Sequence, residues 1–190
     1  MSSLTISEGR KTPLKEKNVL LTSPPGMGKT TVLIKLSELL KDKAAGFYTR
    51  EIRQNNRRQG FEIVSLEGKR IPLAHVDFSS SPYRVSKYGV KPENLEDFLK
   101  EIKDALDKKD NKCLLIDEIG KMELFNENFK KTVIEALDSK VPVIATIMSR
   151  GEPFCNALKK RPDVRVMEVT RENRNQLPSQ LFKGIKSCIS

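Results

Sequence analysis

The sequence has only one histidine, three cysteines and no tryptophan among its 190 residues. Cys113, Cys155 and Cys188 are odd in number and far apart in the chain, so they indicate neither a disulfide framework nor a zinc site. Cys113 lies in an apolar run and is expected to be a core residue. Because His75 is the only histidine, a mechanism that needs a histidine base would depend on this one residue, which we expect to be structural or exposed.

Long apolar runs are also absent. No stretch approaches the roughly 18 apolar residues of a membrane span, so no membrane partner is expected. The first residues lack the apolar core of a secretory signal, and the default expectation is therefore a cytoplasmic protein. With 37% hydrophobic and 32% charged residues, the chain has the composition of a soluble globular protein. Its length favours one domain at 17–190 after a loose polar arm at 1–16, and we expect a monomer.

The net charge of +10 raises the question of nucleic-acid binding, because lysines and arginines that neutralise phosphates release counterions. Basic and acidic residues are interleaved, however, and the basic clusters at 57–58, 108–109 and 159–161 are typical of solvated faces or helix ends. A basic surface also serves a small polyanion such as a nucleotide. Nucleic acid is therefore a less favoured partner than nucleoside triphosphates, although the composition leaves it open.

Residues 18 to 30 form the most informative segment, an apolar strand that runs into a Gly-rich turn ending in Lys29-Thr30. This pattern is typical of a phosphate-binding loop (Walker A), in which glycines let backbone amides at a helix N-terminus surround a phosphate. Lys29 would reach the β- and γ-phosphates, and the Thr30 hydroxyl would hold Mg²⁺. The residues expected to bind the nucleotide here are Ser23, Pro24, Pro25, Gly26, Met27, Gly28, Lys29, Thr30 and Thr31.

The loop departs from the usual pattern at its first position, where Ser23 replaces glycine. If that position needs a positive φ, a side chain there costs about 1–2 kcal/mol. Pro24 and Pro25 donate no amide hydrogen, so the phosphate-binding amides must come from Gly26 through Thr30.

A second segment, at 113–118, is a continuous apolar run that ends in two carboxylates, as expected of a strand buried on both faces (Walker B). Asp117 is placed to bind Mg²⁺, directly or through water. Glu118 is expected on the opposite side of the strand end, where it could polarise an attacking water. Taken alone, such a pair of carboxylates could equally be polar residues that face solvent where a strand ends.

The remaining pattern predicts strands that alternate with helices. We predict strands at 18–23, 113–118, 141–147 and 164–170, and helices at 29–42, 92–108, 126–139, 153–160 and in a C-terminal segment broken or restarted at Pro178. Three β-prone runs at 44–53, 60–66 and 70–74 predict antiparallel hairpins, and 76–91 is expected to be a loop. Pro92 suits a first helical turn, and Asn126 is a plausible N-cap.

Alternation of this kind predicts an α/β fold with three layers, in which helices flank a mostly parallel, doubly wound sheet with added antiparallel hairpin strands. The ligand of such a sheet lies beyond the carboxyl ends of the strands. This rule places residues 23–30, Asp117, Glu118 and the loop that starts near Met148 around one crevice.

Five strings occur in order along the chain: GFYTRE at 46–51, GFEIV at 60–64, RVSKYG at 84–89, IDEIGKMELF at 116–125 and ENRN at 172–175. With them, residues 18 to 182 resemble the nucleoside-triphosphatase family that includes cancer-related nucleoside-triphosphatase. The resemblance implies a RecA-like P-loop NTPase sheet and Mg²⁺-dependent hydrolysis of ATP, GTP and other nucleoside triphosphates with loose base choice. It adds Gly120 and Lys121 to the expected nucleotide-binding residues.

In this interpretation, Lys29 and Glu118 are the catalytic residues, and Thr30 and Asp117 hold the metal. Transfer of the γ-phosphoryl group to water needs positioning and charge neutralisation more than covalent chemistry. Further positive charge could come from Arg84, Lys87, Arg150 or Arg174. Two alternatives stay open, a nucleotide or small-metabolite kinase and a nucleotide-dependent protein that binds RNA or a protein partner.

Overall fold

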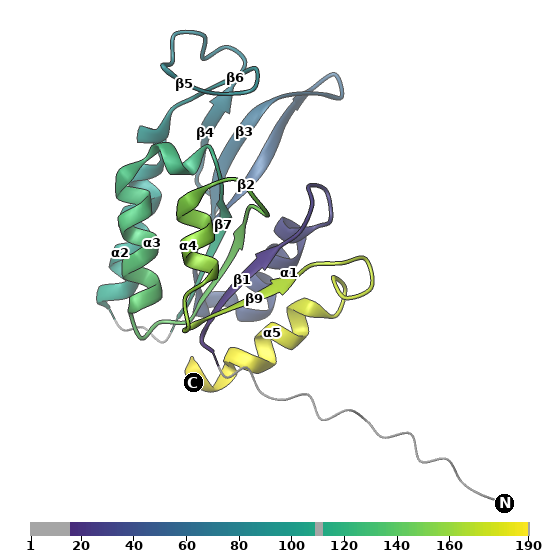
Figure 1. Ribbon diagram of the computed structural model, residues 1–190, viewed down its shortest axis with the longest axis vertical. Helices are drawn as coiled ribbons and strands as arrows, with labels where there is room; N and C mark the ends of the chain where they lie inside the picture. The colour runs from purple at the N-terminus through teal and green to yellow at the C-terminus, as the bar shows by residue number, and fades with distance from the viewer. Residues whose placement is uncertain (1–15, 109–111, 190) are drawn as a thin grey trace, which may run out of the picture.

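The computed structural model describes residues 16–108 and 112–189, so nearly all of the predicted N-terminal arm lies outside the described residues. Its strands form one nine-stranded sheet in the order β5-β6-β4-β3-β2-β7-β8-β1-β9 (Figure 1). The strands are β1 (Asn18–Thr22), β2 (Ala44–Gln54), β3 (Arg57–Ser65), β4 (Arg70–His75), β5 (Tyr83–Val85), β6 (Tyr88–Val90), β7 (Cys113–Ile119), β8 (Val143–Ile147) and β9 (Val164–Glu168).

The half of the sheet that runs from β2 to β9 is parallel. β1 pairs with β8 on one side and with β9 on the other, and β7 pairs with β8 and β2. Three consecutive residues of β1, Val19, Leu20 and Leu21, are fully buried, as expected of a parallel strand covered on both faces. β8 therefore separates the strand that leads into the Gly-rich turn from the strand that ends in Asp117.

The other half of the sheet, from β2 to β5, is antiparallel. The predicted hairpins are confirmed, since β2, β3 and β4 coincide with the three β-prone runs. The prediction of a loop over the whole of 76–91 is wrong, because β5 and β6 form a further hairpin there. Each of these strands has three residues, too few for a periodic pattern, and the turn between them places Ser86 at a φ of 56°.

Helices cover both faces of the sheet, which confirms the three layers of the predicted α/β fold (Figure 1). Apolar residues of α1 and α5 pack on one face, and those of α2, α3 and α4 pack on the other. The helices are α1 (Lys29–Leu40), α2 (Glu96–Asp107), α3 (Glu127–Asp138), α4 (Pro153–Lys159) and α5 (Leu177–Ile185). Short 3-10 turns lie next to them in the described ranges, namely η1 (Lys41–Lys43), η2 (Pro92–Leu95), η3 (Glu123–Phe125) and η4 (Lys186–Cys188).

The helix boundaries show how local residues set the ends. Asn126 is the N-cap of α3, as predicted, because its side chain accepts a hydrogen bond of 2.9 Å from the backbone N–H of Phe129. Pro92 opens the 3-10 turn η2 rather than an α-helix, so α2 begins four residues later than predicted. Pro178 is the second residue of α5, where its missing N–H costs no helical hydrogen bond.

None of the helices in the described ranges is long and apolar enough to cross a membrane. The carboxyl ends of β1, β8 and β7 meet at one edge of the sheet, and the antiparallel strands rise beyond this edge on one side (Figure 1). This edge carries the predicted site residues.

Candidate active site

The turn between β1 and α1 has the backbone of a phosphate loop. Gly26 and Gly28 have φ angles of 78° and 98°, a region that residues with a side chain rarely adopt. A Cβ at Gly26 would meet no atom within 4 Å, so backbone conformation rather than space explains this glycine. α1 begins at Lys29, directly after the loop, so the free backbone amides of its first turn lie next to the loop.

Ser23, the departure from the loop pattern, costs no strain of the kind that the sequence suggested. The non-glycine residues with positive φ in the described ranges are Lys41, Asn55, Asn56 and Ser86, and Ser23 is not among them. Its side chain is buried, and Oγ donates to the carbonyl oxygen of Pro24 at 3.0 Å. The penalty expected for a serine at this position does not arise.

Asp117 is fully buried at the end of β7 and receives four hydrogen bonds from three threonines. Thr30 Oγ1 donates to its Oδ2 at 2.8 Å, and the N–H and Oγ1 of Thr49 donate to the same oxygen at 3.2 and 3.1 Å. Thr146 Oγ1 donates to the other oxygen, Oδ1. The predicted pairing of Thr30 with Asp117 is therefore present, whereas Thr49 and Thr146 were not anticipated.

Glu118 faces the phosphate loop instead of pointing away from Asp117. Its Oε2 lies 3.5 Å from Lys29 Nζ, and the two side chains are 31% and 10% exposed. Lys29 Nζ also donates to the carbonyl oxygen of Ser23 at 3.4 Å. The expectation that the two carboxylates lie on opposite sides of the strand is wrong, because both contact the first residues of α1.

Burial raises the pKa of Glu118 above the ordinary value of 4.5. The positive charge of Lys29 opposes this shift, and the negative charge of Asp117 adds to it. A carboxylate with a raised pKa is a better proton acceptor than an exposed one, provided that it is still ionised at the working pH.

A third acidic residue, Glu123, lies behind this pair and was not expected in the site. It belongs to η3 and is 5% exposed, and burial raises its pKa to about 8. A Cβ at Gly120 would lie 3.2 Å from Glu123 Oε2 and 3.3 Å from Glu118 Oε1, so both carboxyl groups pack against this glycine. Gly120 was predicted to bind nucleotide, and its missing side chain leaves room for the carboxyl groups of Glu118 and Glu123.

Replacing Glu123 with glutamine should stabilise the protein in a pH-dependent way. In the unfolded chain its pKa is about 4.5, and in the folded protein it is about 8, so the folded state keeps the proton that the unfolded state loses as the pH rises. The contribution of Glu123 to the free energy of unfolding is fully present below the pKa of the unfolded chain. It is lost as the pH rises toward the pKa of the folded protein. Glu123→Gln should therefore gain about 3 kcal/mol over the wild type at pH 7 and little at pH 5.

Urea unfolding of both proteins at pH 5 and pH 7 measures this difference. Glu135→Gln, on the exposed face of α3, makes the same chemical change at a solvated position and should leave stability nearly unchanged at both pH values. An equal gain for Glu123→Gln at both pH values would show that Glu123 does not keep its proton.

Of the four candidate charge stabilisers, the structure brings Arg174 to the phosphate loop. A Cβ at Gly28 would lie 3.8 Å from Arg174 Cδ. Arg84 is held within the β5–β6 hairpin, where its guanidinium donates to the carbonyl oxygens of Ser79 and Lys87. Arg150 is exposed in the loop between β8 and α4.

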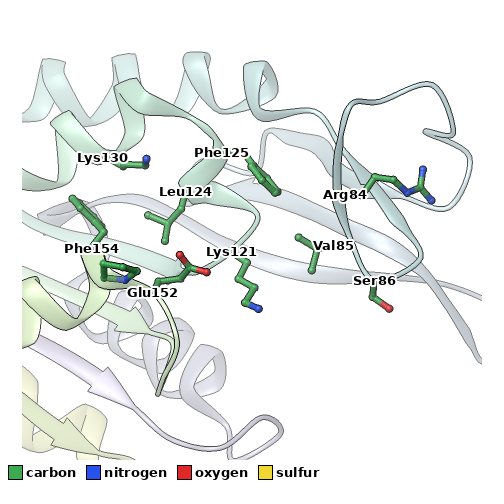
Figure 2. Close-up of a pocket in the computed structure, with 10 residues that line it drawn as sticks. Arg84, Val85, Ser86, Lys121, Leu124, Phe125, Lys130, Glu152 and Phe154 are labelled. Atoms are coloured by element: carbon green, nitrogen blue, oxygen red, sulfur yellow. The ribbon is translucent and has the colours of Figure 1, made fainter.

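Lys87 and Lys121 each line a hollow beside the hairpin. The ammonium group of Lys87 lies 5.4 Å from the centre of the Tyr88 ring. Lys121, predicted to bind nucleotide, lines a hollow that Arg84 also lines, and its ammonium end points away from Arg84 (Figure 2).

These features together define the class of the protein. A phosphate loop after β1, a carboxylate strand separated from it by β8, and helices on both faces of the sheet are the elements of a P-loop NTPase. The fold class expected from the sequence is confirmed by solved structures with the same fold. The chain aligns with the crystal structure of THEP1 from Aquifex aeolicus with a TM-score of 0.77 and 34% identity, over 86% of this chain and 95% of that one.

Sequence comparison identifies the family. The model of the NTPase family matches residues 18–182, and the chain belongs to this family. It is 52% identical to nucleoside-triphosphatase THEP1 of Natranaerobius thermophilus, over 91% of this chain and 98% of that relative. It is 38% identical to human cancer-related nucleoside-triphosphatase over 90% and 97% of the two chains, and the solution structure of a human cancer-related nucleoside triphosphatase superposes with a TM-score of 0.76. The resemblance seen in the sequence is confirmed, and these relatives are named nucleoside-triphosphatases.

Proposed function

We propose that the protein hydrolyses ATP, GTP and other nucleoside triphosphates to the diphosphate and inorganic phosphate, with Mg²⁺ as cofactor. The observation that carries this proposal is the pairing of two consecutive residues of α1 with two consecutive carboxylates of β7. Lys29 contacts Glu118, and Thr30 contacts Asp117. The names of the relatives support the same activity.

The phosphate loop and Lys29 would bind the triphosphate. Free amides of the loop and of the first turn of α1 donate hydrogen bonds to phosphate oxygens, and the helix dipole favours their negative charge. Lys29 Nζ lies 3.5 Å from Glu118 Oε2 and the lysine side chain is only 10% exposed, and its ammonium group would turn from this carboxylate to the terminal phosphates when substrate binds. Arg174, beside Gly28, is the remaining candidate for neutralising charge on the phosphates.

The Thr30 and Asp117 pair fits a magnesium ion. Two oxygen atoms, Thr30 Oγ1 and Asp117 Oδ2, lie 2.8 Å apart at the end of the phosphate loop. Mg²⁺ prefers oxygen ligands and is commonly bound by one or two protein groups together with substrate phosphates and water. When bound, it would neutralise charge that develops on the β- and γ-phosphate oxygens. The threonines at 49 and 146 would keep Asp117 in a single orientation for this role.

Glu118 would orient the attacking water and accept its proton. The water oxygen forms a bond to the γ-phosphorus, the bond from this phosphorus to the bridging oxygen breaks, and one water proton passes to the Glu118 carboxylate. Once Lys29 moves its charge to the phosphates, Glu118 loses a favourable partner, so its basicity rises further when substrate is bound. The phosphate loop would contact the phosphates rather than the base, so we expect loose base choice.

Phosphate release from ATP, GTP, CTP and UTP, each measured with Mg²⁺ and with a chelator, tests the proposal. We expect turnover of all four substrates in Mg²⁺, with differences of at most about tenfold between bases, and loss of nearly all turnover when the metal is removed. Restoring Mg²⁺ should restore the rate. Undiminished phosphate release in chelator would contradict the role given to Thr30 and Asp117.

A further inference from the structure

Two neighbouring hollows lie against the β5–β6 hairpin and form one grooved region of the surface. The first, of about 500 Å³, lies between the hairpin, η3 and the start of α4 (Figure 2). The second, of about 660 Å³, lies between the hairpin and the β2–β3 strands. Val85 and Ser86 line both hollows, so the two lie next to each other against the same segment of the hairpin. We call this surface the basic groove and define it by its cations Arg53, Arg57, Arg58, Arg84, Lys87 and Lys121.

Positive charge dominates the basic groove. The charged residues that line the second hollow are all cations, and in the first hollow Glu152 is the one acidic lining residue beside three cations. Glu51 pairs with both Arg53 and Arg58, at 2.6 and 2.7 Å. Within residues 16–108 and 112–189, no carboxylate pairs with the four cations Arg57, Arg84, Lys87 and Lys121. A concave surface with this excess of one sign attracts a polyanion.

Aromatic rings accompany the cations along the groove. Phe125 and Phe154 line the first hollow, and both are partly exposed. Tyr83 is 42% exposed and lies 5.1 Å from Phe125, measured between ring centres. Phe61 lines the second hollow, with the Arg58 guanidinium 5.1 Å from its ring centre. An acidic peptide would use only the cations, whereas unpaired bases would also stack on the rings.

We propose that the basic groove binds single-stranded nucleic acid. Its unpaired cations contact the phosphates, and the rings of the first hollow take the bases. A single strand fits better than a duplex because the rings lie inside the hollow, where only bases with free faces can reach them. The site is distinct from the phosphate loop, none of whose residues lines either hollow, and it does not depend on the hydrolysis proposed above.

The groove also ends close to the carboxylates. Lys121 directly follows Gly120, and Gly120 packs against the carboxyl groups of Glu118 and Glu123. A nucleic-acid strand bound at Lys121 would therefore contact the residue that follows Gly120, the glycine against which Glu118 packs.

Fluorescence anisotropy with labelled oligouridylate and oligodeoxythymidylate strands of about 12 nucleotides tests the proposal on the whole chain, at 50 and 200 mM salt. If four cations each neutralise one phosphate, affinity for a single strand should fall by about 50-fold over this range of salt. The RNA and DNA strands show which sugar is preferred, and a duplex of the same length should bind more weakly than either.

Two pairs of variants locate the site. Arg57→Glu with Lys87→Glu reverses two groove cations and should weaken binding by at least about tenfold and lower the salt slope by about 1.4. Lys35→Glu with Lys103→Glu makes the same change of net charge on exposed faces of α1 and α2 and should change affinity by less than about threefold. Should the double groove variant fail to fold, as judged by circular dichroism, Arg57→Glu alone, at the exposed start of β3, carries the same test.

Ring variants separate base stacking from charge. Phe154→Leu keeps an apolar side chain and should weaken binding by at least about fivefold without changing the salt slope. Phe182→Leu, on α5, is the matched control and should leave affinity unchanged.

Four results would each overturn the proposal. They are no binding of either strand at 50 mM salt, equal loss in the groove and control charge variants, equally tight binding of the duplex, and displacement of the strand by polyglutamate as effective as that by unlabelled oligonucleotide. The last result would assign the groove to an acidic protein partner. A fifth result, displacement of the strand by a Mg²⁺-nucleoside triphosphate alone at equal phosphate concentration, would also overturn the proposal and would assign the groove to the nucleotide site.

Discussion

Replacing Glu118 with glutamine is expected to lower kcat by about 10²–10⁴-fold, the usual range for general-base assistance. Glutamine keeps the size of the side chain but cannot accept the water proton. Binding of the Mg²⁺-nucleotide complex should persist, because Glu118 acts while the bond is breaking and Lys29 is released from its only carboxylate partner among the described residues. Turnover and nucleotide affinity should be measured in the same preparation.

Glu38→Gln is a suitable control. Glu38 is exposed on the same helix as Lys29, and the substitution makes the same change of charge as Glu118→Gln. It should leave kcat within about twofold. If Glu118→Gln kept turnover within about threefold of the wild type while nucleotide binding collapsed, Glu118 would be a metal-site residue and the proton acceptor would lie elsewhere.

Replacing Lys29 with alanine should lower turnover by at least about 10²–10³-fold, the range for removing one group that stabilises transition-state charge. Nucleotide affinity should fall as well, because the ammonium group contacts phosphates in both the bound state and the transition state. The loss also removes the charge that opposes the raised pKa of Glu118, so this pKa should rise further. The fold should survive, because within the described ranges the charged end of Lys29 contacts only Glu118 and the carbonyl oxygen of Ser23.

Lys35→Ala, an exposed position six residues further along α1, provides the matched control and should leave both constants unchanged. A folded Lys29→Ala protein that hydrolyses substrate as fast as the wild type would refute the assignment of the phosphate loop.

The sequence predicted the parts of the site that depend on local chemistry. Gly26 and Gly28 mark a turn that needs positive φ, and the apolar run before Asp117 marks a strand buried on both faces. Because parallel strands end at one edge of a sheet, the sequence also placed the loop and the carboxylates in the same crevice. The predicted neighbours Thr30 and Asp117 are in contact for this reason.

The contacts that the sequence did not reveal depend on the order of strands. Thr49 and Thr146 reach Asp117 because β2 and β8 lie on either side of β7, and neither residue carries a local signal that distinguishes it from other strand threonines. Glu123 looks like an ordinary polar residue in the sequence, and only the turn η3 buries it beside Glu118. The strands β5 and β6 are too short to show a periodic sequence pattern. Their hairpin joins the sheet because β6 pairs with β4.

Other expectations stay predictions. These are the cytoplasmic location, the monomeric state, the domain boundary at residue 17, and the roles of the individual site residues. Among the candidate charge stabilisers, position beside the phosphate loop favours Arg174 over Arg84 and Lys87, which line the basic groove.

The central claim, that water attacks the γ-phosphate of the bound nucleotide, is tested most directly by turnover of Mg²⁺-ATP in ¹⁸O-labelled water, with mass analysis of both products. The account predicts one ¹⁸O atom in each inorganic phosphate released, none in the diphosphate, and equal amounts of the two products whether or not candidate phosphoryl acceptors are added. A phosphorylated acceptor formed in place of labelled inorganic phosphate would contradict hydrolysis and would show that the protein is a kinase.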